Sequence, residues 1–168
     1  MPAVLAFDPG NVETAYCLID TETRKPIEFG KVKNEDALVY IYRYFETHTE
    51  LKAIIIEMVA SYGMAVGKSV FDTCVMIGRL TEAASNLGLR AEYIYRIEEK
   101  TTICHDSKAK DANIRQALID RFAQHDMKNG KGTKKDPDWF YGFAADTWSA
   151  YAVAITWLEK REKEGMKL

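Results

Sequence analysis

The chain has 168 residues, 47% of them hydrophobic and 29% charged, and a formal net charge of −2 at pH 7. This composition predicts one domain over residues 1–168, with a core large enough to need no disulfide or structural metal. No apolar run approaches the roughly 20 residues that span a bilayer and no signal-like segment opens the chain, so we expect a cytoplasmic protein without membrane contact.

The first part of the chain predicts three consecutive strands in an antiparallel meander. They cover residues 3–8, 13–20 and about 25–33, and polar turns separate them. A helix follows, with Asn34 as its N-cap. Its apolar residues recur at the spacing of one helical face: Leu38, Ile41, Tyr42 and Phe45.

Strands and helices alternate in the rest of the chain. A strand at 53–58 precedes a helix at about 68–87, whose predicted core residues are Val70, Cys74, Ile77 and Ala84. Later elements are, in order, a strand at 91–97, a polar loop near 98–108, a helix containing Ile114, Ala117, Leu118 and Phe122, a Gly/Lys loop at about 126–138, and a helix to about 163. This order predicts an α/β fold with a mixed sheet and helices on both faces.

Three acidic residues stand where strands end or a helix begins. Asp8 closes the first apolar run and is followed by Pro9 and Gly10, and Glu57 closes the run AIIIEM. Asp146 opens an Ala-rich helical segment near the C-terminus. A carboxylate at the end of a buried strand is poorly placed for packing and well placed to bind a metal, so we predict that the three share a two-metal site for phosphoryl transfer.

These residues and the order of elements resemble the ribonuclease H-like superfamily, and more closely the RuvC-type Holliday-junction resolvases. In that family an IDPG-like strand end carries the first metal-binding Asp, and AFDPG matches it at Asp8. A strand-end Glu matches Glu57, and the first acid of a C-terminal DxxDAxAxA helix matches Asp146. The resemblance covers most of the chain and implies a ribonuclease H-like fold and a Mg²⁺-dependent endonuclease with two ions per site, for which Mn²⁺ substitutes.

Ser149 departs from the family pattern, because it stands where the family has a second acid on the C-terminal helix. Residues at i and i+3 share a helix face, so we expect Ser149 to face the site as a weak ligand for one metal. Asp111, Asp136 and Asp138 are alternative sources of the missing carboxylate. The departure and the short chain also suit a phage-encoded member, which would act in the host cytoplasm.

The resemblance also implies residues that bind DNA. A DNA-contacting Lys of the family and a second basic residue about ten positions later match Lys100 and Lys110, with Lys108 as an alternate. Tyr62 is a candidate for stacking on an unpaired base, while we predict that Phe71 lies in the core. The sequence KNGKGTKK at 128–135 is either a solvated loop or a further DNA contact.

The implied function is paired cleavage of Holliday junctions, or of related forks and flaps, by a homodimer. For the dimer interface we expect the helix at 68–87, where Met76, Leu80 and Ala83 add apolar surface. One alternative is a small-molecule kinase of the actin-like superfamily. The turn Asp8-Pro9-Gly10-Asn11 resembles the phosphate-binding turn of those kinases. The other is a catalytically silent relative that only binds nucleic acid.

The cysteines are Cys17, Cys74 and Cys104, and their scattered positions predict buried, reduced thiols rather than a zinc site or a disulfide framework.

Overall fold

A mixed sheet organises the molecule. The computed structural model describes residues 1–48 and 50–166, and its strands are β1 (Ala3–Pro9), β2 (Glu13–Asp20), β3 (Pro26–Lys33), β4 (Leu51–Met58) and β5 (Arg90–Tyr95). They lie in the order β3-β2-β1-β4-β5. β1 and β3 each pair antiparallel with β2, whereas β4 pairs parallel with β1 and with β5. The predicted meander and mixed sheet are confirmed.

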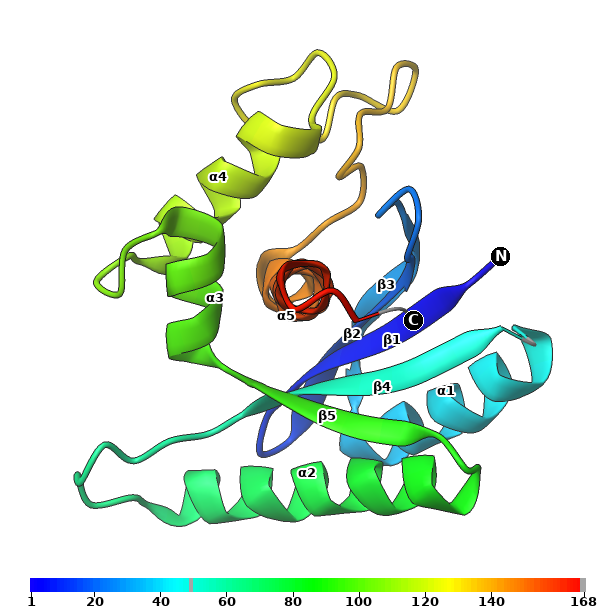
Figure 1. Ribbon diagram of the computed structural model, residues 1–168, viewed down its shortest axis with the longest axis vertical. Coiled ribbons are helices and arrows are strands. Elements are labelled where there is room, and N and C mark those ends of the chain that lie inside the picture. Colours follow the sequence, from blue (N-terminus) through cyan, green and yellow to red (C-terminus); the bar gives the residue numbers. More distant parts are fainter. Residues whose placement is uncertain (49, 167–168) are drawn as a thin grey trace.

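Helices cover both faces of this sheet (Figure 1). They are α1 (Asn34–Thr47), α2 (Lys68–Asn86), α3 (Arg96–Cys104), α4 (Asp111–Phe122) and α5 (Ala145–Lys163). α1 and α2 lie on one face, and α5 lies on the other, where α3 and α4 pack against it. This arrangement leaves the ends of β1, β4 and β5 next to the beginnings of α3 and α5.

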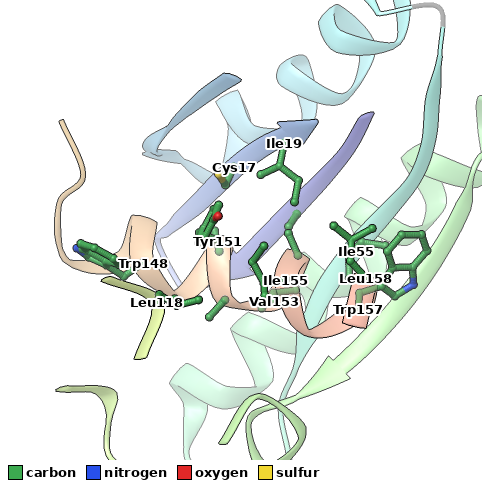
Figure 2. Close-up of a cluster of buried hydrophobic side chains, with 14 of the residues drawn as sticks. Cys17, Ile19, Ile55, Leu118, Trp148, Tyr151, Val153, Ile155, Trp157 and Leu158 are labelled. Carbon is green, nitrogen blue, oxygen red and sulfur yellow. The ribbon is translucent and has the colours of Figure 1, made fainter. Parts of the chain in front are cut away.

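Each face of the sheet has its own hydrophobic core. Along β1, Leu5 and Phe7 join the cluster under α1 and α2, whereas Val4 and Ala6 join the cluster under α5, as the two-residue repeat of a strand requires. Figure 2 shows the second cluster, in which Tyr151 and Ile155 of α5 pack over the sheet. Because β1 is buried on both faces, its sequence is a continuous apolar run up to Asp8.

The prediction of a polar loop near 98–108 was wrong, because residues 96–104 form α3, and β5 ends at Tyr95 rather than at 97. The helix begins where the carboxylate of Glu98 accepts the backbone N–H of Tyr95 at 2.7 Å. Its inner face contains Glu99, Thr102 and Ile103, all buried. Two of these three residues are polar, so the segment lacks the apolar stripe that identifies a helix in a sequence.

The buried face of α1 also differs from the predicted one. It consists of Ala37, Ile41 and Tyr44, whereas Tyr42 is 42% exposed and Phe45 is 38% exposed. Lys33 rather than Asn34 occupies the N-cap position. The side chain of Asn34 instead binds the turn after β1, as described below.

Some residues of α2 that were predicted at a dimer interface lie in the core, and some that were predicted in the core are exposed. Met76, Leu80 and Ala83, expected at a dimer interface, are buried against the sheet of the same chain. Cys74, expected in the core, is exposed. Phe71 was also predicted to be buried and is 59% exposed. The apolar residues of α2 exceed what one face holds, and the sequence alone did not show which of them face the sheet.

The remaining predicted core residues of α2 are closer to expectation: Ile77 and Ala84 are buried and Val70 is half-buried. Of the other cysteines, Cys17 is buried and Cys104 is half-buried, and both are free thiols. Among the described residues, no helix combines the length and hydrophobicity needed to cross a membrane.

Candidate active site

The register of the sheet places Asp8 beside Glu57. β1 and β4 are parallel neighbours in which Phe7 pairs with Ile56, so the next residue of each strand is one of the two acids. Both side chains leave the sheet at the edge where these strands end. The two carboxyls lie close enough to affect each other: their interaction lowers the pKa of Asp8 and raises the pKa of Glu57. Two groups 49 positions apart in the sequence therefore meet because of strand pairing alone.

A compact turn fixes the backbone directly after Asp8. The Gly10 N–H donates to the Glu13 carbonyl at 2.9 Å, and a Cβ on Gly10 would lie 2.6 Å from that same oxygen. Asn34 at the start of α1 braces the turn: its Nδ2 donates to the Gly10 carbonyl at 3.1 Å and its Oδ1 accepts the Thr14 hydroxyl at 2.7 Å. Gly10 and Asn34 thus fix the geometry of the strand end.

Helix α5 brings Asp146 and Ser149 to the same place. Asp146 lies in the first turn, where the helix dipole favours a carboxylate. Its Oδ2 is 2.6 Å from the Nζ of Lys31, which also lies 3.1 Å from Glu13. Lys31 lies in line with Asp8 two strands away, because Asp8 pairs with Ala15 and Ala15 pairs with Lys31. The hydroxyl of Ser149 is close enough to Asp8 to lower the pKa of that carboxyl by hydrogen bonding.

Arg96 and Glu99, on the first turn of α3, form a charged pair above the ends of the strands. The Arg96 guanidinium donates to Glu99 and also to Asp111 of α4. Glu99 is completely buried, and its Oε1 has no hydrogen-bond partner among the described residues. The negative charges of Glu99, Asp111 and Glu57 raise the pKa of Arg96 despite its burial. Arg96 is therefore a permanent cation among the carboxylates.

The carboxyls of the site hold their protons unusually strongly. Burial, followed by the charges of Glu99 and Asp8, raises the pKa of Glu57 to about 10. Burial raises the pKa of Glu99 to about 8, although Arg96 opposes the shift. The pKa of Asp8 is raised by burial and by Asp146, against the hydrogen bonds from Glu57 and Ser149. Crowded, desolvated carboxylates of this kind require a proton or a cation to balance their charge.

The residues of the site fit a divalent cation that accepts oxygen ligands. The orphaned Oε1 of Glu99 and the adjacent Asp8–Glu57 pair supply carboxylate oxygens without enough protein cations to balance them. In the described part of the chain, no three acidic, His or Cys side chains converge as a complete metal cage. Mg²⁺ commonly takes only one or two protein carboxylates, together with water and substrate phosphates, so a partial set suits it.

Two cavities meet at these residues. One, of about 260 Å³, is lined by Asp8, Glu57, Tyr62 and Arg96 among others. The second, of about 280 Å³, lies on the other side of Arg96 and is lined by Asp111, Asp146 and Ser149. Tyr62 is 68% exposed with a left-handed backbone, at φ 48°, so its ring stands at the edge of the first cavity and is free to contact a ligand.

The three acids that were considered as alternative metal ligands, Asp111, Asp136 and Asp138, lie in different places. Asp111 lies at the cavity and pairs with Arg96, whereas Asp136 and Asp138 line none of the cavities around Asp8. The Asp138 carboxylate instead accepts backbone N–H groups of its own loop. Neither Asp136 nor Asp138 therefore lies where it could replace the acid that was expected at the position of Ser149.

Of the three predicted DNA-binding lysines, Lys100 is half-buried on α3, next to Glu99. Lys108 lies exposed in the turn before α4, and Lys110 is the exposed N-cap residue of that helix. All three lie within residues 96–111, the segment that begins with Arg96 and ends with Asp111.

Sequence reasoning missed Arg96, Glu99 and Lys31 as members of this site. Arg96 and Glu99 stand at i and i+3, which is a signal for charged groups on one helix turn. Because Arg96 was placed in the predicted strand at 91–97 and Glu99 in the predicted loop near 98–108, that signal was not used. Lys31 gives no comparable signal, since only the pairing of β2 with β3 brings it near Asp146.

Comparison with known proteins gives matches in structure alone: neither family models nor curated protein sequences match the chain. A structure of T. thermophilus RuvC in complex with Holliday junction substrate is similar at a TM-score of 0.75 and 11% identity, covering 99% of each chain. Another Thermus thermophilus RuvC structure gives 0.68 at 15% identity, over 98% of this chain and 97% of that one.

The crystal structure of the yeast mitochondrial Holliday junction resolvase gives a TM-score of 0.57 at 13% identity, over 96% of this chain and 80% of that one. Likeness at these identities establishes the fold. The chain has the ribonuclease H-like fold of RuvC, as its sequence predicted.

Proposed function

We propose that this protein is a metal-dependent endonuclease that cleaves four-way DNA junctions or related branched DNA. The observation that carries the proposal is the side-by-side placement of Asp8 and Glu57 at the ends of neighbouring strands, with Asp146 and Ser149 facing them from α5. The RuvC fold, which covers nearly the whole chain, supports the same conclusion, because one of the similar structures is a complex with Holliday junction substrate and another is a Holliday junction resolvase.

In this proposal the acids of the site hold divalent ions at the scissile phosphate. Asp8 and Glu57 are the primary ligands, Asp146 and Ser149 complete the set, and Mg²⁺ or Mn²⁺ binds as a pair of ions. When bound, such ions stabilise charge on the attacking and leaving oxygens and make water a better nucleophile. The pKa values of Asp8 and Glu57 are raised, so these carboxyls would have to lose their protons to hold an ion.

Two protein cations set the charge of the site. Arg96 is anchored by Glu99 and Asp111, so its guanidinium stays in place as phosphate enters and adds fixed positive charge next to it. Lys31 holds the Asp146 carboxylate at 2.6 Å, which orients this acid before an ion arrives. Tyr62, at the mouth of the Asp8–Glu57 cavity, is positioned to stack on a base beside the cut.

We also propose that the protein acts as a homodimer, because two symmetric cuts in a four-way junction need two sites. The interface does not use Met76, Leu80 or Ala83, which are buried in the core. The apolar side chains that α2 leaves exposed are Phe71 and Val75.

The decisive experiment compares Asp8→Asn with wild type on synthetic four-way, three-way and linear DNA in Mg²⁺. Asp8→Asn removes a charge and a ligand at constant size, so we expect cleavage of the four-way substrate to fall roughly 100-fold or more. Junction affinity measured in EDTA should stay near that of wild type. Asp36→Asn, an exposed acid in the first turn of α1, is the matched control and should cleave normally.

The other outcomes separate the alternative functions. Junction binding without cleavage by wild type in Mg²⁺ or Mn²⁺ identifies a catalytically silent relative. Metal binding that appears only with a nucleotide identifies a kinase. Near-normal cleavage by Asp8→Asn at saturating Mg²⁺ contradicts the proposed site itself.

A further inference from the structure

The loop between α4 and α5, residues 123–144, carries charge that the candidate site does not use. Its segment 128–135 contains Lys128, Lys131, Lys134 and Lys135 and no acidic residue. None of these lysines forms an ion pair with another described residue. Figure 1 shows the loop rising from the end of α4 and returning to the beginning of α5.

Buried Asp138 holds the base of this loop in a fixed conformation. Its carboxylate accepts the backbone N–H groups of Gln124, His125, Asp126 and Trp139 at 2.6–2.9 Å. Burial alone would raise the pKa of Asp138, but these hydrogen bonds outweigh burial and lower it. A side chain with so many backbone partners organises the chain around itself.

The tip of the loop is fixed in the same way. The Asp126 carboxylate accepts the N–H groups of Asn129, Lys131 and Gly132 at 3.0–3.2 Å. Gly132 has φ 64°, and a Cβ there would lie 2.3 Å from the Asp136 carbonyl oxygen. The Phe140 N–H donates to the Gly130 carbonyl at 2.8 Å, and its ring is buried in the core. The lysine side chains take no part in any of these contacts, so they extend from a preformed backbone.

Arg115 of α4 connects this loop to the candidate site. It lines the 280 Å³ cavity that contains Asp146 and Ser149. It also lines a cavity of about 250 Å³ that contains Lys128 and Lys131. Its guanidinium lies 5.2 Å from the ring centre of Trp148, a contact that holds it between the two cavities. Arg115 therefore places a cation between the candidate site and Lys128 and Lys131 of the loop.

We propose that Arg115, Lys128 and Lys131 bind the phosphate backbone of DNA beyond the cleaved phosphate. The inference rests on the proposed function, because it needs a DNA strand in the site. Phosphates spaced along a strand match cations spaced along a surface, and a preformed loop binds them without an ordering cost. Asp126 lies among these cations, but its charge is already engaged by three backbone N–H groups.

The test measures the salt dependence of junction binding. Fluorescence anisotropy of a labelled four-way junction in EDTA, over a range of KCl concentrations, gives the slope of log K against log salt. We expect the double variant Lys128→Ala/Lys131→Ala to reduce the slope by about 1.8, since each phosphate contact contributes about 0.9. Lys128→Arg/Lys131→Arg keeps both charges and should keep the slope.

Two further variants make the test specific. Lys52→Ala/Lys163→Ala removes the same charge from exposed lysines at the beginning of β4 and the end of α5, and should leave the slope unchanged. Gly132→Ala keeps every charge but disturbs the loop backbone, and should weaken binding at low salt. Single-turnover cleavage at saturating protein should be unchanged in Lys52→Ala/Lys163→Ala, because these two lysines line none of the cavities around the carboxylates.

An unchanged slope in Lys128→Ala/Lys131→Ala, or an equal loss in Lys52→Ala/Lys163→Ala, overturns the inference while the proposed function stands. Wild-type protein that binds no junction overturns the proposed function as well. The two failures are distinguished by the wild-type measurement alone.

Discussion

The buried carboxyl of Glu57 makes metal-free stability depend on pH. Its folded-state pKa of about 10 exceeds the ordinary 4.5, so between these values the folded state keeps a proton that the unfolded state has lost. The free energy of unfolding therefore falls as pH rises through this window, by up to about 1.4 kcal/mol per pH unit. In EDTA we expect the melting temperature to drop from pH 5.5 to pH 8.

Glu57→Gln does not titrate and should flatten that drop, whereas Glu46→Gln, an exposed acid on α1, should not. Thermal melts at several pH values check the prediction. Mg²⁺ should stabilise wild type more at pH 8 than at pH 5.5, because protons compete with it less. A drop of equal size in Glu57→Gln and wild type would mean that other groups cause it.

Ser149 offers a second test at the level of one residue. Its hydroxyl reaches Asp8 and it lines the cavity with Asp146, so an acid at this position would face the same ligands. We expect Ser149→Asp to lower the Mg²⁺ concentration for half-maximal cleavage roughly tenfold, in the range that metal-site changes commonly produce. Ser149→Ala should have a small effect, because only a weak ligand is lost.

Cleavage measured against Mg²⁺ concentration, with a melting curve for each variant, decides this point. An unaltered midpoint in a folded Ser149→Asp protein would place that position outside the metal site. Attention would then move to Glu99, the buried acid whose Oε1 lacks a partner among the described residues.

At the scale of elements, α1 supports the site through one side chain. Asn34 satisfies the buried Thr14 hydroxyl and the Gly10 carbonyl, which ties the helix to the turn after Asp8. We expect Asn34→Ala to lower the free energy of unfolding by about 1–3 kcal/mol, because it leaves polar groups without partners. Cleavage should fall as well, since the turn that positions Asp8 loosens.

Urea unfolding measures the loss of stability. The double variant Asn34→Ala/Thr14→Val removes both the hydroxyl and its acceptor, and should recover part of the stability lost in Asn34→Ala. Equal stability of the single and double variants would show that the Thr14 hydrogen bond contributes little.

Sequence predicted the elements best where burial is apolar. Residues 3–7 of β1 and 53–56 of β4 are continuous apolar runs that end at Asp8 and Glu57, and these runs predicted both strands. α3 was missed because its buried face includes Glu99 and Thr102, whose burial depends on Arg96 and on contacts from other elements. A polar side chain that is buried because it forms an ion pair or hydrogen bond is predicted from the sequence to be exposed.

At the scale of the whole molecule, the mixed sheet with helices on both faces was predictable from the order of elements. The division of α2 between core and surface was not, since Met76 and Leu80 differ from exposed Val75 and Phe71 only in rotation about the helix axis. The strands of the described residues form a single five-stranded sheet.

The pairing of β1 with β4 constrains how this protein can change during evolution. Because Asp8 and Glu57 are adjacent only while Phe7 pairs with Ile56, one inserted or deleted residue in either strand would turn a carboxylate to the opposite face. Substitutions that preserve the alternation of faces leave the pair intact, whereas changes of length within either strand do not. The strand pairing depends on the backbone register and the alternation of faces, so most side chains can differ while the fold stays the same, as the similarity to a RuvC structure at 11% identity illustrates.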